Sequence, residues 1–161
     1  MGIILNTTKN NCSIALWDIS ESLEELLQIA NSFNTAKFKT EKRKKEFLTS
    51  RLLLEQFSPN VIITYNEFGA PELSNGDCIS ISHSKNLVAV IICTKKVGID
   101  IEQISGKALR LSSKFVSEKN LKKISKEKAT LIWCIKEAAY KWHQKGGVDF
   151  IKDIVIPEFS A

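Results

Sequence analysis

Two carboxylates in the segment VGIDIE have the spacing of a shared cation site. Asp100 and Glu102 stand two residues apart in and beside a predicted β-strand, 97–101. Side chains two residues apart on a strand project from the same face of the sheet. Two like charges repel unless a cation lies between them, and Mg²⁺ is bound by one or two carboxylates with waters and substrate phosphates. The pair is therefore a candidate magnesium site; the alternative is a solvated strand face that pairs with lysines.

The segment from residue 129 to 144 predicts a helix with two chemically different faces. One side carries an aliphatic stripe that is expected to face the core, made of Leu131, Ile135, Ala138 and Trp142. The opposite side carries Trp133, Lys136, Glu137, Tyr140 and Lys141. Aromatic rings among the charges indicate a second docking surface. The alternative is that Glu137 and Lys141 form an ordinary surface pair four residues apart, worth only tenths of a kcal/mol.

Polar and basic residues elsewhere are suited to binding phosphates. Ser82 and His83 end a predicted strand, 79–82, and adjacent strand residues point to opposite faces, which argues against a Ser–His nucleophile pair. The cluster fits either a grip on a phosphate or base, or a structural turn. Arg51 stands among apolar residues of a predicted helix, 40–57, where an unpaired charge would be unfavourable. The same helix contains the basic run Lys42, Arg43, Lys44 and Lys45.

The charge of the chain is concentrated in its second half. The 161 residues carry a net charge of +5, and residues 76–161 contribute fifteen basic against nine acidic side chains. An anionic partner fits this bias, as does a solvated lysine-rich surface. None of the four cysteines lies within three residues of another, so we expect all four to be reduced and structural.

The pattern of apolar residues predicts an α+β fold made of two lobes. Each lobe is predicted to run strands, helix, helix, strand, over residues 3–65 and 79–156. The helices are predicted over about 22–31, 40–57, 117–127 and 129–144. A hairpin is predicted around residues 9–11, a loop over NEFGAPELSNGD and a last strand over 151–156. The two lobes, 1–75 and 76–161, are interpreted as pseudo-repeats that form a pseudodimer with a ligand cleft between them. No apolar run approaches the roughly 18 residues of a membrane span, and no signal peptide is recognised at the amino terminus. We therefore expect a cytoplasmic protein that does not act on membranes.

Four segments taken in order resemble the phosphopantetheinyl transferases, specifically the larger, surfactin-synthetase-activating type. The matching segments are NEFGAPEL, ISISHS, VGIDIE and WCIKEAAYK. The resemblance implies transfer of 4′-phosphopantetheine from coenzyme A to a serine of an acidic apo carrier protein, with release of adenosine 3′,5′-bisphosphate. It also implies Mg²⁺ dependence, a two-lobed monomer and no nucleic-acid partner.

The resemblance assigns roles to individual residues. It implies that Asp100, Glu102 and Glu137 bind magnesium, and that Glu137 is also the base for the carrier serine. Lys141 corresponds to a lysine that grips the pyrophosphate, and Lys136 to one near the transferring phosphoryl group. Contacts with coenzyme A are implied for Ser82, His83 and Arg51, the last assisted by Lys42 or Lys45.

Two departures from the family pattern bear on coenzyme A binding and on activity. Ala70 stands where the family usually has a lysine that contacts the nucleotide, and the predicted second lobe is shorter than usual. Three alternatives follow: a non-catalytic paralogue that binds coenzyme A or a carrier, a basic module for anionic ligands or nucleic acid, and a magnesium-dependent nucleotide hydrolase. A nucleic-acid module should interleave basic and aromatic residues, but the lysine-rich stretch 114–128 contains only Phe115.

Overall fold

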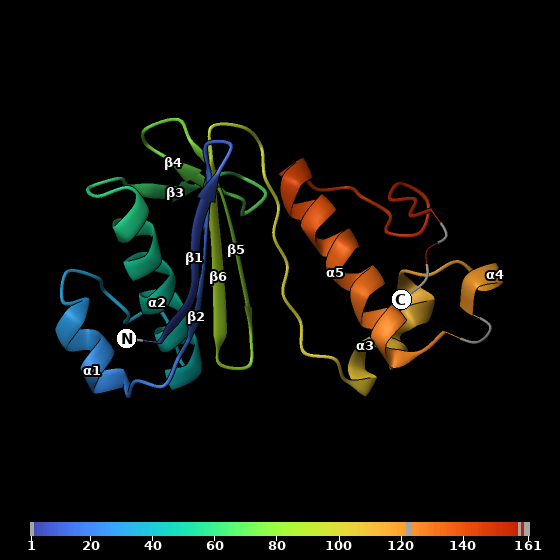
Figure 1. Cartoon of the computed structure of the whole chain (residues 1–161), viewed down its shortest axis with the longest axis horizontal. Helices are drawn as coiled ribbons and strands as arrows, with labels where there is room; N and C mark the ends of the chain where they lie inside the picture. Colours follow the sequence, from blue (N-terminus) through green and yellow to red (C-terminus); the bar gives the residue numbers. More distant parts are fainter. Residues whose placement is uncertain (1, 122–123, 158, 160–161) are drawn as a thin grey trace.

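A six-stranded antiparallel sheet forms the first part of the molecule (Figure 1). The computed structural model describes residues 2–121, 124–157 and 159. The strands lie in the order β1-β2-β6-β5-β4-β3. Their bounds are β1 (Ile3–Lys9), β2 (Cys12–Asp18), β3 (Ile63–Tyr65), β4 (Pro71–Leu73), β5 (Cys78–Ser84) and β6 (Leu87–Cys93).

Tight turns join the neighbouring strands at both ends of the central ladder. Asn10 and Asn11 have φ angles of 52° and 60°, so the β1–β2 turn uses the left-handed region that asparagine tolerates well. Lys85 has a φ of 52° in the turn between β5 and β6. The predicted hairpin around residues 9–11 is confirmed, whereas β4 lies in a stretch that the sequence had indicated to be loop.

Two helices cover one face of the sheet (Figure 1). Helix α1 (Leu23–Ile29) begins at Ser22 with a capping box closed by Glu25, and α2 (Glu41–Phe57) begins at Thr40. Both helices were predicted within two residues of their observed ends. The buried core between helices and sheet includes Trp17, Leu26, Leu48, Leu53, Ile79, Val88 and Val90.

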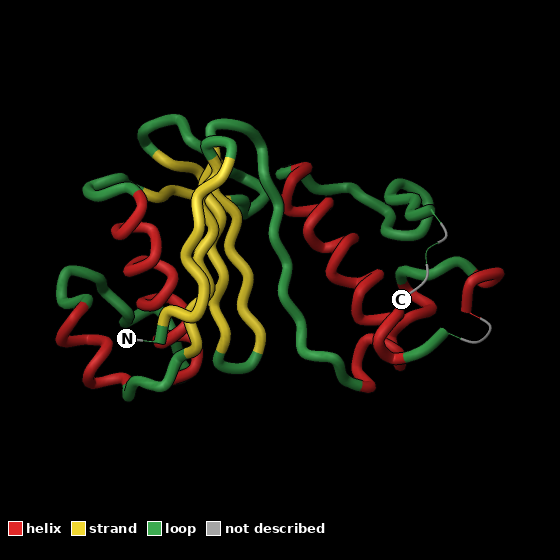
Figure 2. Tube along the Cα trace, viewed as in Figure 1, coloured by secondary structure: helices red, strands yellow, loops and turns green. Residues whose placement is uncertain are grey.

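The remainder of the described chain consists of helices and loops and lies beyond the other face of the sheet (Figure 2). It contains α3 (Gly106–Leu111), the short 3₁₀ helix η1 (Ser112–Lys114), α4 (Glu118–Leu121) and α5 (Lys126–His143). A second, smaller core forms around Phe115, Val116 and Ile132. The helix predicted over 117–127 corresponds to α4 and the start of α5, and residues 122–123 lie outside the described residues. No helix in the described ranges is long and apolar enough to cross a membrane.

Two predicted strands are absent from the structure. Residues 97–104 are extended, but every second backbone N–H group donates to a serine hydroxyl oxygen of β5. No backbone-to-backbone ladder therefore forms. Residues 151–153 belong to a turn in which the Asp149 carboxylate accepts hydrogen bonds from the N–H groups of Ile151 and Lys152. An aspartate that bonds the backbone two and three residues ahead favours a turn over a strand. Both predictions were therefore wrong.

The prediction of the buried face of α5 was also wrong. Leu131, Ile135 and Trp142 are 43%, 38% and 51% exposed, although their spacing predicted a core stripe. The opposite side packs instead, because the Trp133 ring lies 5.0 Å from that of Phe115, with further aromatic contacts around it. Periodicity identifies two helix faces, but it does not say which one meets the rest of the chain.

The mixed α and β composition agrees with the predicted fold class, and the strands are distributed differently from the prediction. The predicted lobe boundary between residues 75 and 76 falls inside the sheet, since β5 and β6 lie between β2 and β4. Within the described ranges, no strand follows β6. The interpretation as two pseudo-repeated lobes stays a prediction.

The expectation of four reduced cysteines was wrong for two of them. Cys12 and Cys93 form a disulfide between the directly paired ends of β2 and β6. The two residues are 81 positions apart, so sequence spacing gave no indication of the pairing. Cys78 and Cys134 are free thiols.

Gly98 is predicted to be indispensable for the packing of the 97–104 segment on α5. A Cβ atom at this position would lie 1.9 Å from the Ala138 carbonyl oxygen, which belongs to helix backbone and cannot move aside. We expect Gly98→Ala to lower the free energy of unfolding by about 1–3 kcal/mol, measured by urea denaturation. The matched control is Gly106→Ala, whose nearest neighbour is the flexible Arg110 side chain at 3.5 Å. Equal stability of the two variants would contradict the prediction.

Candidate active site

A cavity of about 430 Å³ opens between α2, the β3–β5 part of the sheet and the carboxyl-terminal end of α5. Its size suits a ligand larger than a few atoms. Basic side chains dominate its charged lining: Lys37, Arg43, Arg51, Lys141 and Lys145, against the single carboxylate of Glu46. Aromatic rings of Phe38, Phe47, Tyr65, Phe68 and Tyr140 complete much of the wall. The cavity therefore combines cations with flat apolar surfaces.

Arg51 is a buried cation without a carboxylate partner in the described part of the chain. Its residue is only 4% exposed, and its guanidinium donates to Tyr65 Oη at 2.8 Å and to Ser50 Oγ at 3.3 Å. The guanidinium carbon also lies 4.5 Å from the centre of the Phe47 ring. A buried charge held by neutral groups is unfavourable unless an anion approaches it. Because Arg51 lines the cavity, this is the place where a phosphate would be best stabilised.

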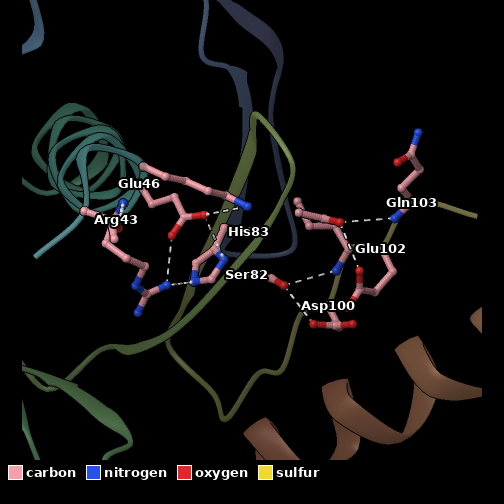
Figure 3. A network of polar contacts seen from close by, with 11 residues as sticks. Arg43, Glu46, Ser82, His83, Asp100, Glu102 and Gln103 are labelled. Carbon is pink, nitrogen blue, oxygen red and sulfur yellow. Dashed lines mark hydrogen bonds and ion pairs between the residues drawn. The ribbon is translucent and has the colours of Figure 1, made fainter. Parts of the chain in front are cut away.

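Arg43, Glu46 and His83 form a bonded triad at the wall of the cavity (Figure 3). Arg43 Nη1 lies 2.8 Å from Glu46 Oε2 and 2.6 Å from His83 Nε2. Because the guanidinium donates, the imidazole accepts at Nε2 and carries its proton on Nδ1, 3.4 Å from Glu46 Oε1. Burial lowers the pKa of His83; Glu46 opposes this, while Arg43 and Lys141 reinforce it. The triad therefore holds a neutral histidine next to the cations.

Asp100 lies on the extended segment between the sheet and α5. Its Oδ1 accepts from Ser82 Oγ at 2.8 Å and from Lys141 Nζ at 2.6 Å. Lys141 also donates to the Ile99 carbonyl, so it joins this segment to α5 and reaches the cavity as well. The second carboxylate oxygen of Asp100, Oδ2, is buried and has no hydrogen-bond partner in the described part of the chain. An unsatisfied buried carboxylate oxygen is a position where a cation would be favoured.

Glu137 faces the same group of charges from α5. Burial raises its pKa, the Lys141 ammonium lowers it, and the carboxylates of Asp100 and Glu102 raise it further. The four side chains therefore interact electrostatically at close range. Among the described residues, Glu137 has no hydrogen bond or ion pair, so its carboxylate is available to a substrate or cation.

Several of the predicted residues lie elsewhere. Lys42 and Lys45 pair with Glu46 and Glu41, at 3.7 and 3.2 Å, and line a second pocket instead of the main cavity. The buried Lys136 ammonium donates to the backbone carbonyls of Phe150 and Ile154. This holds the 149–154 turn on α5. A position of Lys136 beside a transferring phosphoryl group stays a prediction.

Sequence reasoning missed several residues of the cavity wall, among them Lys37, Arg43 and Tyr65. Lys37 and Tyr65 gave no recognisable signal, because each follows a loop or short strand of ordinary composition. Arg43 could have been found. It precedes Phe47 and Arg51 by four and eight residues, a spacing that places all three on one face of α2.

Comparison with known proteins adds one finding to this geometry. Residues 96–159 match the ACPS family model, the 4′-phosphopantetheinyl transferase superfamily. The match begins at the extended segment and includes all of α5, so it covers Asp100, Glu102, Glu137 and Lys141, but it spans fewer than half of the 161 residues. A search of the curated proteins found no match. The family match supports a phosphopantetheinyl-transferase-type activity and leaves the surfactin-synthetase-activating subtype as a proposal.

The family uses coenzyme A and Mg²⁺, and the three candidate carboxylates lie in the matched region. In the described part of the chain, no three His, Cys, Asp or Glu side chains are grouped closely enough to hold a metal ion. The chemistry of the donors nevertheless fits a hard cation, because the buried Oδ2 of Asp100 lacks a partner and Glu102 and Glu137 carry neighbouring carboxylates. Lys141 now supplies the positive charge beside Asp100.

Proposed function

We propose that this protein transfers 4′-phosphopantetheine from coenzyme A to a serine of an acidic apo carrier protein. The observation that carries the proposal is the buried Arg51, which has no carboxylate partner among the described residues. It lies in an otherwise basic cavity that ends at Lys141, beside the carboxylates of the family-matched region. A phosphoadenosine compound has the anionic groups and flat base that such a cavity would bind. On this proposal, the reacting pyrophosphate binds beside these carboxylates.

Residues on both sides of the cavity supply the parts of the reaction. On this proposal, the 3′-phosphate binds at Arg51, the nucleotide contacts His83 and the pyrophosphate binds at Lys141, in line with the family resemblance. Glu137 accepts the hydroxyl proton of the carrier serine. At the same time, the serine oxygen attacks the phosphorus that bears phosphopantetheine. The bond from this phosphorus to the bridging oxygen of the pyrophosphate breaks. Adenosine 3′,5′-bisphosphate leaves with the bonding electron pair. Mg²⁺ held by Asp100, Glu102 and Glu137 would neutralise charge on the phosphoryl oxygens.

The basic second half of the chain supports an acidic carrier as the partner. Opposite charges accelerate the association of two proteins, and the association rate then falls as the salt concentration rises. We further propose that the protein acts as a monomer, as its resemblance to the two-lobed family type implies.

The test is a transfer assay with intact mass readout. The protein is incubated with coenzyme A, Mg²⁺ and a panel of apo carriers from fatty-acid, polyketide and peptide synthesis. A gain of one phosphopantetheine on any carrier is the expected result. If coenzyme A binds in calorimetry but no carrier gains mass, the protein is a binding paralogue; hydrolysis of coenzyme A without a carrier would favour a hydrolase.

Coenzyme A binding is predicted to take up protons through His83. Burial lowers the pKa of His83 below its ordinary value of about 6.5, so the imidazole of the free protein stays neutral at pH values where an ordinary histidine is partly charged. A phosphate beside the imidazole favours the charged form, so the pKa rises on binding and a proton enters. We expect the calorimetric enthalpy near pH 6 to depend on the ionisation enthalpy of the buffer. His83→Gln should remove most of this dependence, and an unchanged dependence in that variant would assign the proton elsewhere.

The same lowered pKa predicts how His83 affects stability. Because the fold favours the neutral imidazole, its contribution is complete above the ordinary pKa and is lost as the pH falls through it. The free energy of unfolding, measured by urea denaturation, should therefore fall less steeply between pH 7.5 and 5 for His83→Gln than for the wild-type chain. Parallel curves would contradict this.

A further inference from the structure

The serines of the segment ISISHS form a ladder against the extended segment 97–104. Ser80, Ser82 and Ser84 alternate along β5 with Ile79, Ile81 and His83, which face α2. Their hydroxyl oxygens accept, in order, the N–H groups of Ile99, Ile101 and Gln103, at 3.1, 3.2 and 3.2 Å. Three side chains thus take the place of a neighbouring strand. The ladder sets the register of the segment that carries the two candidate carboxylates.

Two of the three serines also hold a carboxylate. A hydroxyl group donates one hydrogen bond while it accepts others. Ser82 Oγ donates to Asp100 Oδ1 at 2.8 Å, and Ser84 Oγ donates to Glu102 Oε2 at 3.0 Å (Figure 3). Ser80 differs, because in the described part of the chain its hydroxyl group is hydrogen-bonded to a backbone N–H group and to no carboxylate. Each of the other two fixes both a backbone position and the direction of the carboxylate next to it.

We propose that Ser82 and Ser84 are positioning residues that set the cation affinity of the Asp100 and Glu102 carboxylates. They act through these carboxylates and need no contact with substrate. Asp100 and Glu102 would otherwise swing apart, because like charges two residues apart repel. The inference rests on the proposed function for the use of the cation, but the ladder itself can be tested without any transfer reaction.

The matched variants are Ser84→Ala, Ser80→Ala and Ser84→Thr. Binding of Mn²⁺, as a spectroscopic substitute for Mg²⁺, is measured by electron paramagnetic resonance in the absence of coenzyme A and carrier. Hydrogen exchange of the Ile99 and Gln103 amides is measured on the same samples. Loss of a residue that orients a metal ligand weakens metal binding roughly 10- to 100-fold. We expect that loss for Ser84→Ala, together with faster exchange at Gln103.

The control variant separates positioning from a general structural role. Ser80→Ala should speed exchange at Ile99 and change Mn²⁺ affinity by less than about twofold, since Ser80 touches no carboxylate. Ser84→Thr keeps the hydroxyl group and should restore both readouts. Equal losses in Ser80→Ala and Ser84→Ala, unchanged affinity in Ser84→Ala, or no Mn²⁺ binding by the wild-type chain would overturn the proposal. A wild-type chain that binds Mn²⁺ but transfers nothing would overturn the proposed function instead.

A separate row of cysteines crosses the sheet at the opposite end of the same strands. Cys93 at the end of β6 is paired directly with Cys12 of β2 on one side and with Cys78 of β5 on the other. Directly opposed residues of antiparallel strands share a face, with Cβ atoms about 4.5–5.5 Å apart. Cys12 and Cys93 form the disulfide, and Cys78 is a partly buried free thiol.

We infer that this row is a thiol–disulfide exchange site. A thiolate displaces the far sulfur of a disulfide in line with the bond it breaks. The Cys78 thiol loses its proton to solvent, and its sulfur attacks Cys93 Sγ. The Cys12–Cys93 bond breaks, a Cys78–Cys93 bond forms, and Cys12 leaves as a thiolate that takes up a proton. No net oxidation occurs, and the central cysteine is shared by both states.

The test maps disulfides after equilibration in a glutathione redox buffer. Samples are quenched with acid, alkylated and digested without reduction, and linked peptides are identified by mass spectrometry. The wild-type chain should give both Cys12–Cys93 and Cys78–Cys93 peptides. Cys12→Ser should give only the second pair, through oxidation by glutathione disulfide, and Cys134→Ser should match the wild type. Wild-type protein with the first pair alone, or Cys12→Ser with Cys78 and Cys93 both alkylated, would overturn the inference.

Discussion

Glu137→Gln is expected to lower phosphopantetheine transfer by two or more orders of magnitude. Glutamine keeps the shape of the side chain but cannot accept the serine proton, and general-base catalysis contributes roughly 10²–10⁴-fold. The neutral amide also removes one candidate ligand of the cation. The rate is measured as carrier mass gain per unit time at saturating coenzyme A and Mg²⁺.

The fold of this variant should be intact or slightly more stable. Because burial raises the pKa of Glu137, its ionised form opposes folding at neutral pH, and a neutral residue relieves that penalty. For the same reason, wild-type activity should fall at a higher pH than an ordinary glutamate would dictate. Melting temperature, transfer rate and coenzyme A affinity are measured on one preparation.

Glu127→Gln provides the matched control for this experiment. Glu127 begins the same helix, but its side chain is 48% exposed and pairs with Lys126 on the surface. Its replacement should leave transfer within about twofold of wild type, as expected for a weak surface pair. Full activity in Glu137→Gln, or equal losses in both variants, would refute the role proposed for Glu137.

Arg51→Met is expected to weaken coenzyme A binding by roughly 10- to 100-fold. A hydrogen bond to a charged group contributes about 1.5–3 kcal/mol, and each 1.4 kcal/mol is a factor of ten in affinity. Methionine keeps the apolar stem against Phe47 and removes a buried cation for which the described residues supply no carboxylate. The melting temperature should therefore change little. Calorimetric titration with coenzyme A measures the affinity.

Two further titrations make the Arg51 result specific. Lys44→Met removes one positive charge from the same helix without changing the lining of the cavity, and its affinity should stay within about twofold of wild type. Dephospho-coenzyme A, which lacks the 3′-phosphate, should bind Arg51→Met and wild type alike if Arg51 holds that group. An Arg51→Met chain that binds coenzyme A as tightly as wild type would remove Arg51 from the site.

The sequence by itself determined the local elements and the chemistry of individual segments. The asparagine turn, the capped helices and the alternation in ISISHS depend on neighbouring residues, and the structure reproduces them. The expectation that Ser82 and His83 face opposite ways is confirmed, since one bonds Asp100 and the other the α2 triad. Local preferences of this kind are physical properties of short stretches of chain.

Tertiary structure decided which of those residues meet. Arg43, rather than Lys42 or Lys45, reaches the cavity because the rotation of α2 is fixed by the core beneath Leu48. The aromatic face of α5 is buried rather than the aliphatic one, because Phe115 and Phe150 come from distant loops to cover it. The 97–104 segment is extended, but serine side chains bind it in place of a neighbouring strand's backbone. Cys12 and Cys93 meet because β2 and β6 pair side by side. All of these contacts join residues far apart in sequence, and their free energies depend on surfaces that form only when the whole chain packs.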